Sequence, residues 1–173
     1  VEPGGTPGAA RTAHPGVVVN EVLARTEQPL NVEDAIELFN TTSQPVNIGG
    51  WYLSDDGDNL AKYRIPAGTI LGPGQYRVFD EDDFNADPPP AGGRAFALNG
   101  QAGESVWLVQ LDEAGQVERF IDDVHFGSAH NGESLGRLPN GEGRLAPLAV
   151  RTLGSANVIP RVGPVVISEL MYN

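Results

Sequence analysis

The chain has 173 residues and a formal charge of −12, from 11 basic and 23 acidic side chains. This charge repels phosphate backbones and anionic lipid surfaces, so no nucleic-acid partner is expected. The chain contains no cysteine, which excludes disulfides and thiolate metal sites, and it has no run of about 18 apolar residues that would predict a membrane span.

Short strands are the expected elements, because the 22 Gly and 14 Pro residues disfavour helices and suit turns. Residues 1–14 carry almost no large apolar side chains and are predicted to be a flexible linker. In the sequence AIELFN, Ile36 and Leu38 alternate with Glu37, as a half-buried antiparallel strand requires. The predicted strands span 17–23, 35–40, 51–55, 62–65, 75–79, 105–111 and 117–126.

These runs are separated by turns rich in Gly, Pro, Asn and Asp, and about seven or more short strands at such spacing predict an all-β, two-sheet antiparallel sandwich. Residues 85–103 are too long for a hairpin and are expected to cross between the sheets or to cover one end. No amphipathic helix is predicted. The residues expected inside are Ile36, Leu38, Trp51, Leu53, Ile65, Val78, Val106 and Leu108.

The last residues of the sequence repeat the first predicted strand. Residues 165–171, VVISELM, align position by position with residues 17–23, VVVNEVL, and a Pro/Gly pair precedes each run. The two runs lie about one domain length apart, which is typical of tandem modules. We therefore predict a sandwich over 15–160, followed over 161–173 by a linker and the first strand of a following repeat.

An apolar strand without its own sheet has unpaired backbone groups and seeks the edge of another sheet. Residues 165–171 are therefore expected to pair with an exposed edge of the preceding sandwich or with a neighbouring molecule, giving strand-mediated self-association. Replacement of residues 17–23 in another copy would give a swapped dimer or an open chain.

Six motifs follow one another along residues 15–145. They read VVVNEV (17–22), AIELFNTT (35–42), PVNIGGWYLSD (45–55), YRIPAGT (63–69), DVHFG (123–127) and SLGRLPNG (134–141). In this order they resemble the bacterial branch of the lamin tail domain family. The resemblance implies an immunoglobulin-like sandwich that serves as an accessory module of large exported or surface proteins, and hence an extracellular or cell-envelope location. Lamin tails also contact chromatin, which the acidic charge argues against here.

Two acidic clusters are candidate metal sites. Ca²⁺ prefers about six to eight oxygen ligands, which two Asp-rich turns at one end of a sandwich could supply. Neither cluster fits the EF-hand pattern, however, and Asp, Asn and Gly also occupy turns for conformational reasons alone. We therefore expect solvated turns and no cofactor, with calcium as the alternative. The candidate ligands are Asp55, Asp56, Asp58, Asp80, Asp82 and Asp83.

A pair of carboxylates on neighbouring strands, Glu21 and Glu37, has the composition of a general acid and base. No cleft residues accompany them in the sequence. The simpler interpretation is that both face solvent or pair with a cation such as Arg64. A catalytic role is therefore not expected for either residue.

Residues 122–130, DDVHFGSAH, contain the residue types of a Ser-His-Asp triad. No nucleophile elbow surrounds Ser128 or Ser134, so nucleophilic catalysis is not expected. His125 shares a strand face with Asp123, and a local hydrogen bond between them is the ordinary outcome. His125 and His130 are also poor zinc candidates, since the chain has only three His and no Cys.

Two further residue types permit either a binding or a structural interpretation. Trp51 and Trp107 could form an exposed platform for sugar or peptide, but each lies in an apolar strand and is expected in or near the core. Arg137, in the SLGR motif, is expected to form an internal ion pair or to brace a turn, because a guanidinium can donate to several carbonyls at once.

These features predict a non-catalytic structural or interaction module of a larger exported protein, used for adhesion, spacing or scaffolding. Neighbouring domains of the same chain are its expected partners. The alternative is a calcium-dependent module that binds carbohydrate or protein through its acidic loops. A hydrolase would need a constellation of residues that the sequence does not contain.

Overall fold

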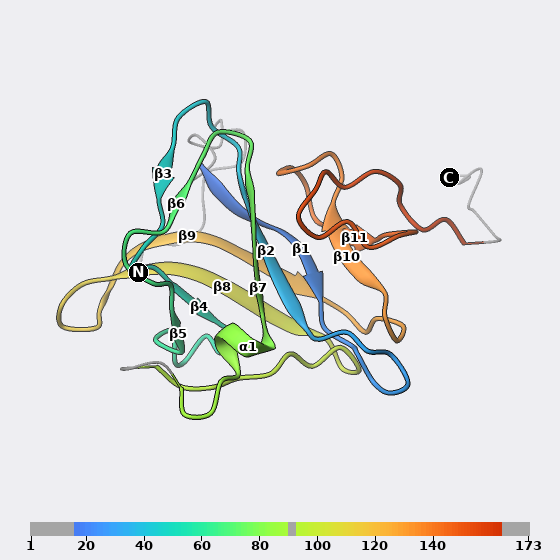
Figure 1. The fold of residues 1–173 in the computed structure, drawn as a ribbon, viewed down its shortest axis with the longest axis horizontal. Coiled ribbons are helices and arrows are strands. Elements are labelled where there is room, and N and C mark those ends of the chain that lie inside the picture. The colour runs from blue at the N-terminus through green and yellow to red at the C-terminus, as the bar shows by residue number, and fades with distance from the viewer. Residues whose placement is uncertain (1–15, 90–92, 164–173) are drawn as a thin grey trace, which may run out of the picture.

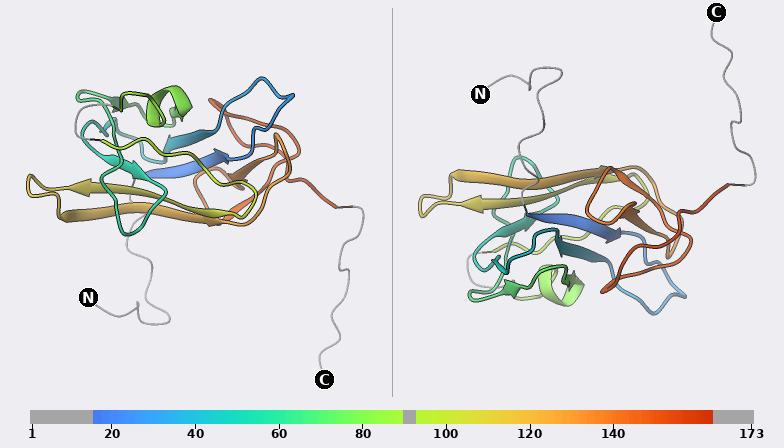
Figure 2. Two further views of the ribbon diagram at one scale, coloured as in Figure 1. Left: turned by 90° about the horizontal axis from the view of Figure 1, so that it is seen from below. Right: turned by 90° about the horizontal axis from the view of Figure 1, so that it is seen from above.

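The computed structural model describes residues 16–89 and 93–163 and contains two stacked antiparallel sheets (Figure 1, Figure 2). Its elements are β1 (Val17–Leu23), β2 (Ala35–Asn40), β3 (Val46–Asn47), β4 (Tyr52–Ser54), β5 (Tyr63–Arg64), β6 (Ile70–Leu71), β7 (Tyr76–Asp80), α1 (Glu81–Phe84), β8 (Glu104–Leu111), β9 (Val117–Phe126), β10 (Ser134–Arg137) and β11 (Leu145–Pro147). The larger sheet has the order β11-β10-β1-β2-β7, the facing sheet β5-β4-β8-β9, and β3 pairs with β6. With 37% of the described residues in strands and 3% in helix, the all-β prediction is confirmed.

The core lies between the two sheets and is filled by the apolar side chains that alternate along the strands. Of the eight residues expected inside, seven are buried: Ile36, Leu38, Trp51, Leu53, Ile65, Val106 and Leu108. The expectation for Val78 is wrong. Its neighbour Phe79 points into the core opposite Ile36, and Val78 is half-buried beside Glu37. Val78 and Phe79 are both apolar, so the alternation of side chains along the strand does not tell which of the two faces inwards.

The two tryptophans lie in different environments. Trp51 is 9% exposed and belongs to the core. Trp107 is half-buried on the outer face of β8, which corrects the expectation that it lies in or near the core. The reason is the strand alternation: Val106 and Leu108 point inwards, so Trp107 points outwards, where its ring meets that of Phe120 edge-on at 6.3 Å.

The first strand, β1, is the centre of the larger sheet and is buried along its whole length between β10 and β2. Val17, Val19 and Val22 belong to the core. The register with β2 shifts between Val19 and Glu21, as at a β-bulge. The polar side chains of Asn20 and Glu21 point away from the core towards residues near the C-terminal end of the described chain.

The connection between β7 and β8 leads from the larger sheet to the facing one, which confirms the crossing predicted for residues 85–103. Its described part is anchored by the stacked rings of Phe84 and Phe96, whose centroids lie 4.7 Å apart. The backbone N–H of Phe96 also donates to the carbonyl of Phe84. This packing covers one side of the sandwich.

The predicted linker over 1–14 and the repeated strand over 165–171 lie outside the described residues. Within 16–89 and 93–163, no helix has the length and apolar character needed to cross a bilayer.

Candidate functional site

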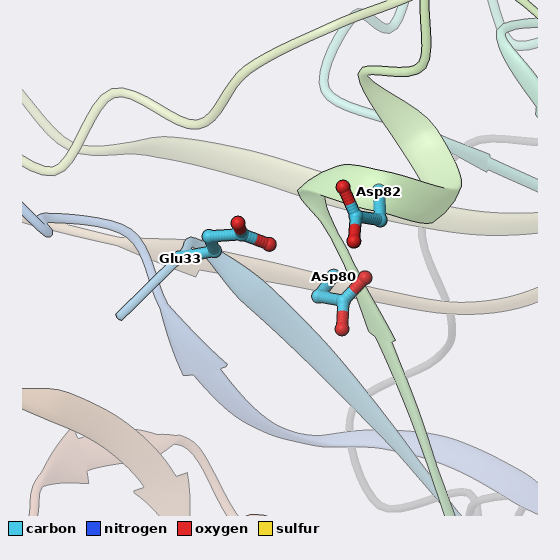
Figure 3. Close-up of side chains that lie close together, drawn as sticks. All are labelled: Glu33, Asp80 and Asp82. Atoms are coloured by element: carbon cyan, nitrogen blue, oxygen red, sulfur yellow. The ribbon is translucent and has the colours of Figure 1, made fainter. Parts of the chain in front are cut away.

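One group of carboxylates gathers where β7 ends and β2 begins. Asp80 is the last residue of β7 and lies opposite Ala35, and this register brings Glu33 close to it. Asp82 follows in α1, and the three carboxylates come within 4.8 Å of one another (Figure 3). The charge of Asp82 is the main cause that raises the pKa of Glu33. Converging oxygen ligands of this kind suit a hard cation such as Ca²⁺.

The other predicted metal ligands are not part of this group. Asp55 forms an ion pair with Lys62, whose ammonium also lies 3.7 Å from Asp56. The side chain of Asp56 accepts the backbone N–H of Asp58 at 2.9 Å, as in an Asx-type turn. Asp83 faces the hydroxyl of Tyr63. The structure therefore unites Asp80 and Asp82 with Glu33, and it gives the remaining acidic residues local roles in turns and packing.

The expected exposure of Glu21 and Glu37 is wrong, because both side chains are fully buried. Glu21 accepts two hydrogen bonds from Thr152, one from the backbone N–H at 3.0 Å and one from the hydroxyl at 2.6 Å. Neither carboxylate pairs with Arg64. They are covered by residues 152–157, a segment without regular secondary structure that lies across the outer face of the larger sheet.

Glu37 occupies the same covered face. One carboxylate oxygen accepts from Asn20 Nδ2 at 2.8 Å, and the other accepts from the backbone N–H of Gly154 at 2.5 Å. Burial raises the pKa of Glu37 to about 7, although both hydrogen bonds act in the opposite direction. In this site desolvation of the charged form outweighs two good donors.

Three asparagines complete this buried polar network. Asn20 Oδ1 accepts the backbone N–H of Gly141, and Asn140 Oδ1 accepts the backbone N–H of Asn157. Asn157 Nδ2 donates to the carbonyls of Asn20 and Arg137, on adjacent strands. We call this network the C-terminal junction; it comprises Asn20, Glu21, Glu37, Asn140, Thr152, Gly154 and Asn157.

Glycine permits close packing at two places in or next to the C-terminal junction. A Cβ atom at Gly136, in β10, would lie 2.5 Å from Asn157 Nδ2. Gly141 has a φ of 73°, and a Cβ atom there would lie 2.6 Å from Thr41 Cγ2. Both glycines belong to the SLGRLPNG motif, so the motif encodes close approach of the backbone to its neighbours.

Arg137 braces the structure from inside, as predicted. Its side chain is 9% exposed and forms an ion pair with Asp122 at 2.9 Å. Its Nε donates to the carbonyl of Val19 at 2.8 Å, and Nη1 donates to the carbonyl of Gly143. Burial raises the pKa of Asp122 while the charge of Arg137 opposes that rise. The pair thereby joins β10 in one sheet to β9 in the other.

Among the described residues, the histidines and serines do not assemble a triad. His125 Nδ1 lies 3.0 Å from Ser105 Oγ on the paired strand, and not against Asp123 as expected, because Ser105 is its register partner in β8. Ser128 is exposed, whereas Ser134 is buried. Within the described residues, His125 has no carboxylate hydrogen-bond partner.

Sequence reasoning missed the residues that hold the C-terminal junction. The signal was present in β1 and β2, where polar Asn20, Glu21 and Glu37 interrupt runs that are otherwise apolar. A polar residue in a central strand needs a buried partner. Those partners, however, come from a segment with no strand pattern of its own.

The Lamin Tail Domain family model matches residues 10–128 of the chain. No curated protein sequence matches the chain. The matched range includes Glu21 and Glu37 but ends before β10, so the residues that cover these two carboxylates lie beyond it.

Proposed function

We propose that this chain, which belongs to the lamin tail domain family, is a non-catalytic structural and interaction module of a larger exported protein. Lamin tail domains are immunoglobulin-like interaction modules. The proposal rests on the contacts that the buried charged groups make. Glu21, Glu37 and the Arg137–Asp122 pair are all engaged in tying distant parts of the chain together.

Buried charged groups that hold distant parts of the chain together suit a structural role and not a catalytic one. A general base needs access to substrate, whereas the carboxylates of Glu21 and Glu37 are buried under residues 152–157. Substrate could reach them only after residues 152–157 had detached. This supports a role in holding a module together at the place where the chain leaves it.

The positions of the two ends support a spacing function. The described chain enters at the start of β1 and leaves beside β11, on the other side of the molecule (Figure 1). Modules joined in this way lie one after another and keep the preceding and succeeding parts of a chain apart. The proposed extracellular or envelope location rests on the resemblance to modules of exported bacterial proteins.

Small-angle scattering of the parent protein tests this function. Deletion of residues 16–163 should shorten the maximum dimension by about one module diameter while the flanking parts keep their folds. As a control, replacement of this module by an unrelated β-sandwich of similar size should restore the length. An unchanged dimension, or loss of a chemical activity that the unrelated sandwich does not restore, would contradict a spacing module.

A second candidate function has one specific observation in its favour. The carboxylates of Glu33, Asp80 and Asp82 converge without a basic partner among the described ion pairs. Calcium held there could present an acidic loop to a carbohydrate or a protein. Calcium-dependent melting separates this candidate from the first.

A further inference from the structure

The last described residues form a two-stranded ribbon at the place where the chain leaves the module. The backbone N–H of Ala149 donates to the carbonyl of Ile159 at 3.0 Å, and that of Arg161 donates to the carbonyl of Pro147 at 2.7 Å. Leu148 and Pro160 form an antiparallel bridge between these bonds. We call residues 147–150 and 158–162 the exit ribbon.

The exit ribbon is unusually apolar for a solvent-facing surface. Four of the seven large hydrophobic side chains that are exposed in the described residues lie on it, and they are 53% to 67% exposed: Val150, Val158, Ile159 and Val162. A pocket between the ribbon and residues 130–134 is lined by Val150, one of these four residues. Several exposed apolar side chains on one short segment, next to a hollow, are typical of an interaction surface.

The sequence immediately after the exit ribbon identifies the partner. Residues 165–171 repeat β1, and β1 is buried along all of its residues between β10 and β2. A strand of that composition needs neighbours on both edges and cover on both faces, as a further module would provide. Only residues 163 and 164 separate the exit ribbon from this repeat, and such a spacer spans less than about 12 Å even when extended.

We infer that the exit ribbon is the contact surface for a following module of the same family in the same chain. The inference rests on the proposed function as a spacing module and names its immediate partner. With so short a spacer, the following module lies against the residues that precede it. Burial of four aliphatic side chains then fixes the angle between the two modules, and a string of modules becomes a stiff rod.

The inference is tested by comparing two lengths of the natural protein, residues 1–163 and the chain continued to the end of the module that begins at Val165. Carbene footprinting read by mass spectrometry reports the accessibility of aliphatic side chains. Labelling of Val150, Val158 and Ile159 should fall about twofold or more in the longer protein, since side chains at a packed interface lose most of their exposed area. Ile70, which is 64% exposed on β6, is the matched control and should not change.

Substitution provides a second, independent measurement. In the longer protein, Val158→Lys together with Ile159→Lys should restore the labelling of Val150 and let the two modules tumble independently in NMR relaxation. Ile70→Lys should do neither. Equal labelling of the exit ribbon in both lengths, with two folded modules, would overturn this inference alone. If the residues after Val165 form no second sandwich, the inference fails because the following module does not exist, while the proposed spacing function is judged separately by the scattering experiment.

Discussion

The carboxylate of Glu37, in the middle of β2, accepts a hydrogen bond from the backbone N–H of Gly154, which lies 117 residues further along the chain. This bond and those of Thr152 to Glu21 tie a segment without strand structure to the outer face of the larger sheet. The part of the chain that is tied to the larger sheet therefore reaches at least residue 157, well past the family match that ends at residue 128.

Stability should rise as the pH falls from 8 to 5. Burial raises the pKa of Glu37 to about 7 and that of Asp34 to about 6, from 4.5 and 3.8. The folded state therefore binds protons that the unfolded chain has already released, so this stabilisation is complete below the unfolded pKa values and is lost as pH rises through about 7. We expect a gain on the order of 2 kcal/mol, measured by urea unfolding at both pH values.

The matched variant for this pH effect is Glu37→Gln. It removes the titrating group but keeps its shape, so the difference in unfolding free energy between pH 5 and pH 8 should shrink. If the variant retains the whole difference, Glu37 is not its source.

Removal of Arg137 should be among the most damaging single substitutions. Arg137→Ala leaves Asp122 with its carboxylate in a largely buried position and without its cation, and it also strips donors from the carbonyls of Val19 and Gly143. We expect a loss of about 3–5 kcal/mol in unfolding free energy. The control is the exposed Arg144, whose replacement by Ala should cost less than about 0.5 kcal/mol. Similar losses for the two variants would contradict the bracing role.

The C-terminal junction should open when Asn157 is truncated. Asn157→Ala removes both donors to the carbonyls of Asn20 and Arg137, at a cost of about 1–3 kcal/mol. Residues 152–157 should then detach locally, and trypsin should cut faster after Arg151 in the folded protein. Ser155→Ala, which loses only a bond to the carbonyl of Thr152, should leave the cleavage rate near that of the parent. Unchanged proteolysis of the Asn157 variant would show that the other bonds suffice.

Millimolar Ca²⁺ should leave the melting temperature unchanged, because solvated acidic turns remain the leading interpretation of the clusters. A real site would stabilise the fold by about 2.7 kcal/mol at a hundredfold excess of calcium over its dissociation constant. A rise in melting temperature that disappears in Glu33→Gln but persists in Asp58→Asn would favour the calcium-binding candidate at the group shown in Figure 3.

Alternation within single strands was enough to predict much of the fold. The alternation of apolar and polar residues in AIELFN placed Ile36 and Leu38 correctly in the core. The bracing role of Arg137 was predicted because a guanidinium can donate several hydrogen bonds. The same reasoning failed for Glu37, because alternation assigns the polar residues of a strand to a solvent-exposed face. Here that face is covered by residues that carry no strand pattern.

The acidic group was predicted only in part for a related reason. Asp80 and Asp82 are neighbours in the sequence and form an evident cluster there. Glu33 joins them through the register of β2 against β7, in which Ala35 lies opposite Asp80. Register is a property of two paired strands, so a search along one run of sequence could not find this third carboxylate.

We propose that the module ends at the C-terminal junction and exit ribbon, and that residues 165–171 belong to the next module of the chain. Equilibrium unfolding and light scattering of residues 1–173 and 1–163 test it most directly. We expect unfolding free energies that agree within about 0.5 kcal/mol, together with weaker self-association of the shorter chain, which lacks residues 165–171. A clear loss of stability on removing residues 164–173 would contradict it, because those residues would then be part of this sandwich.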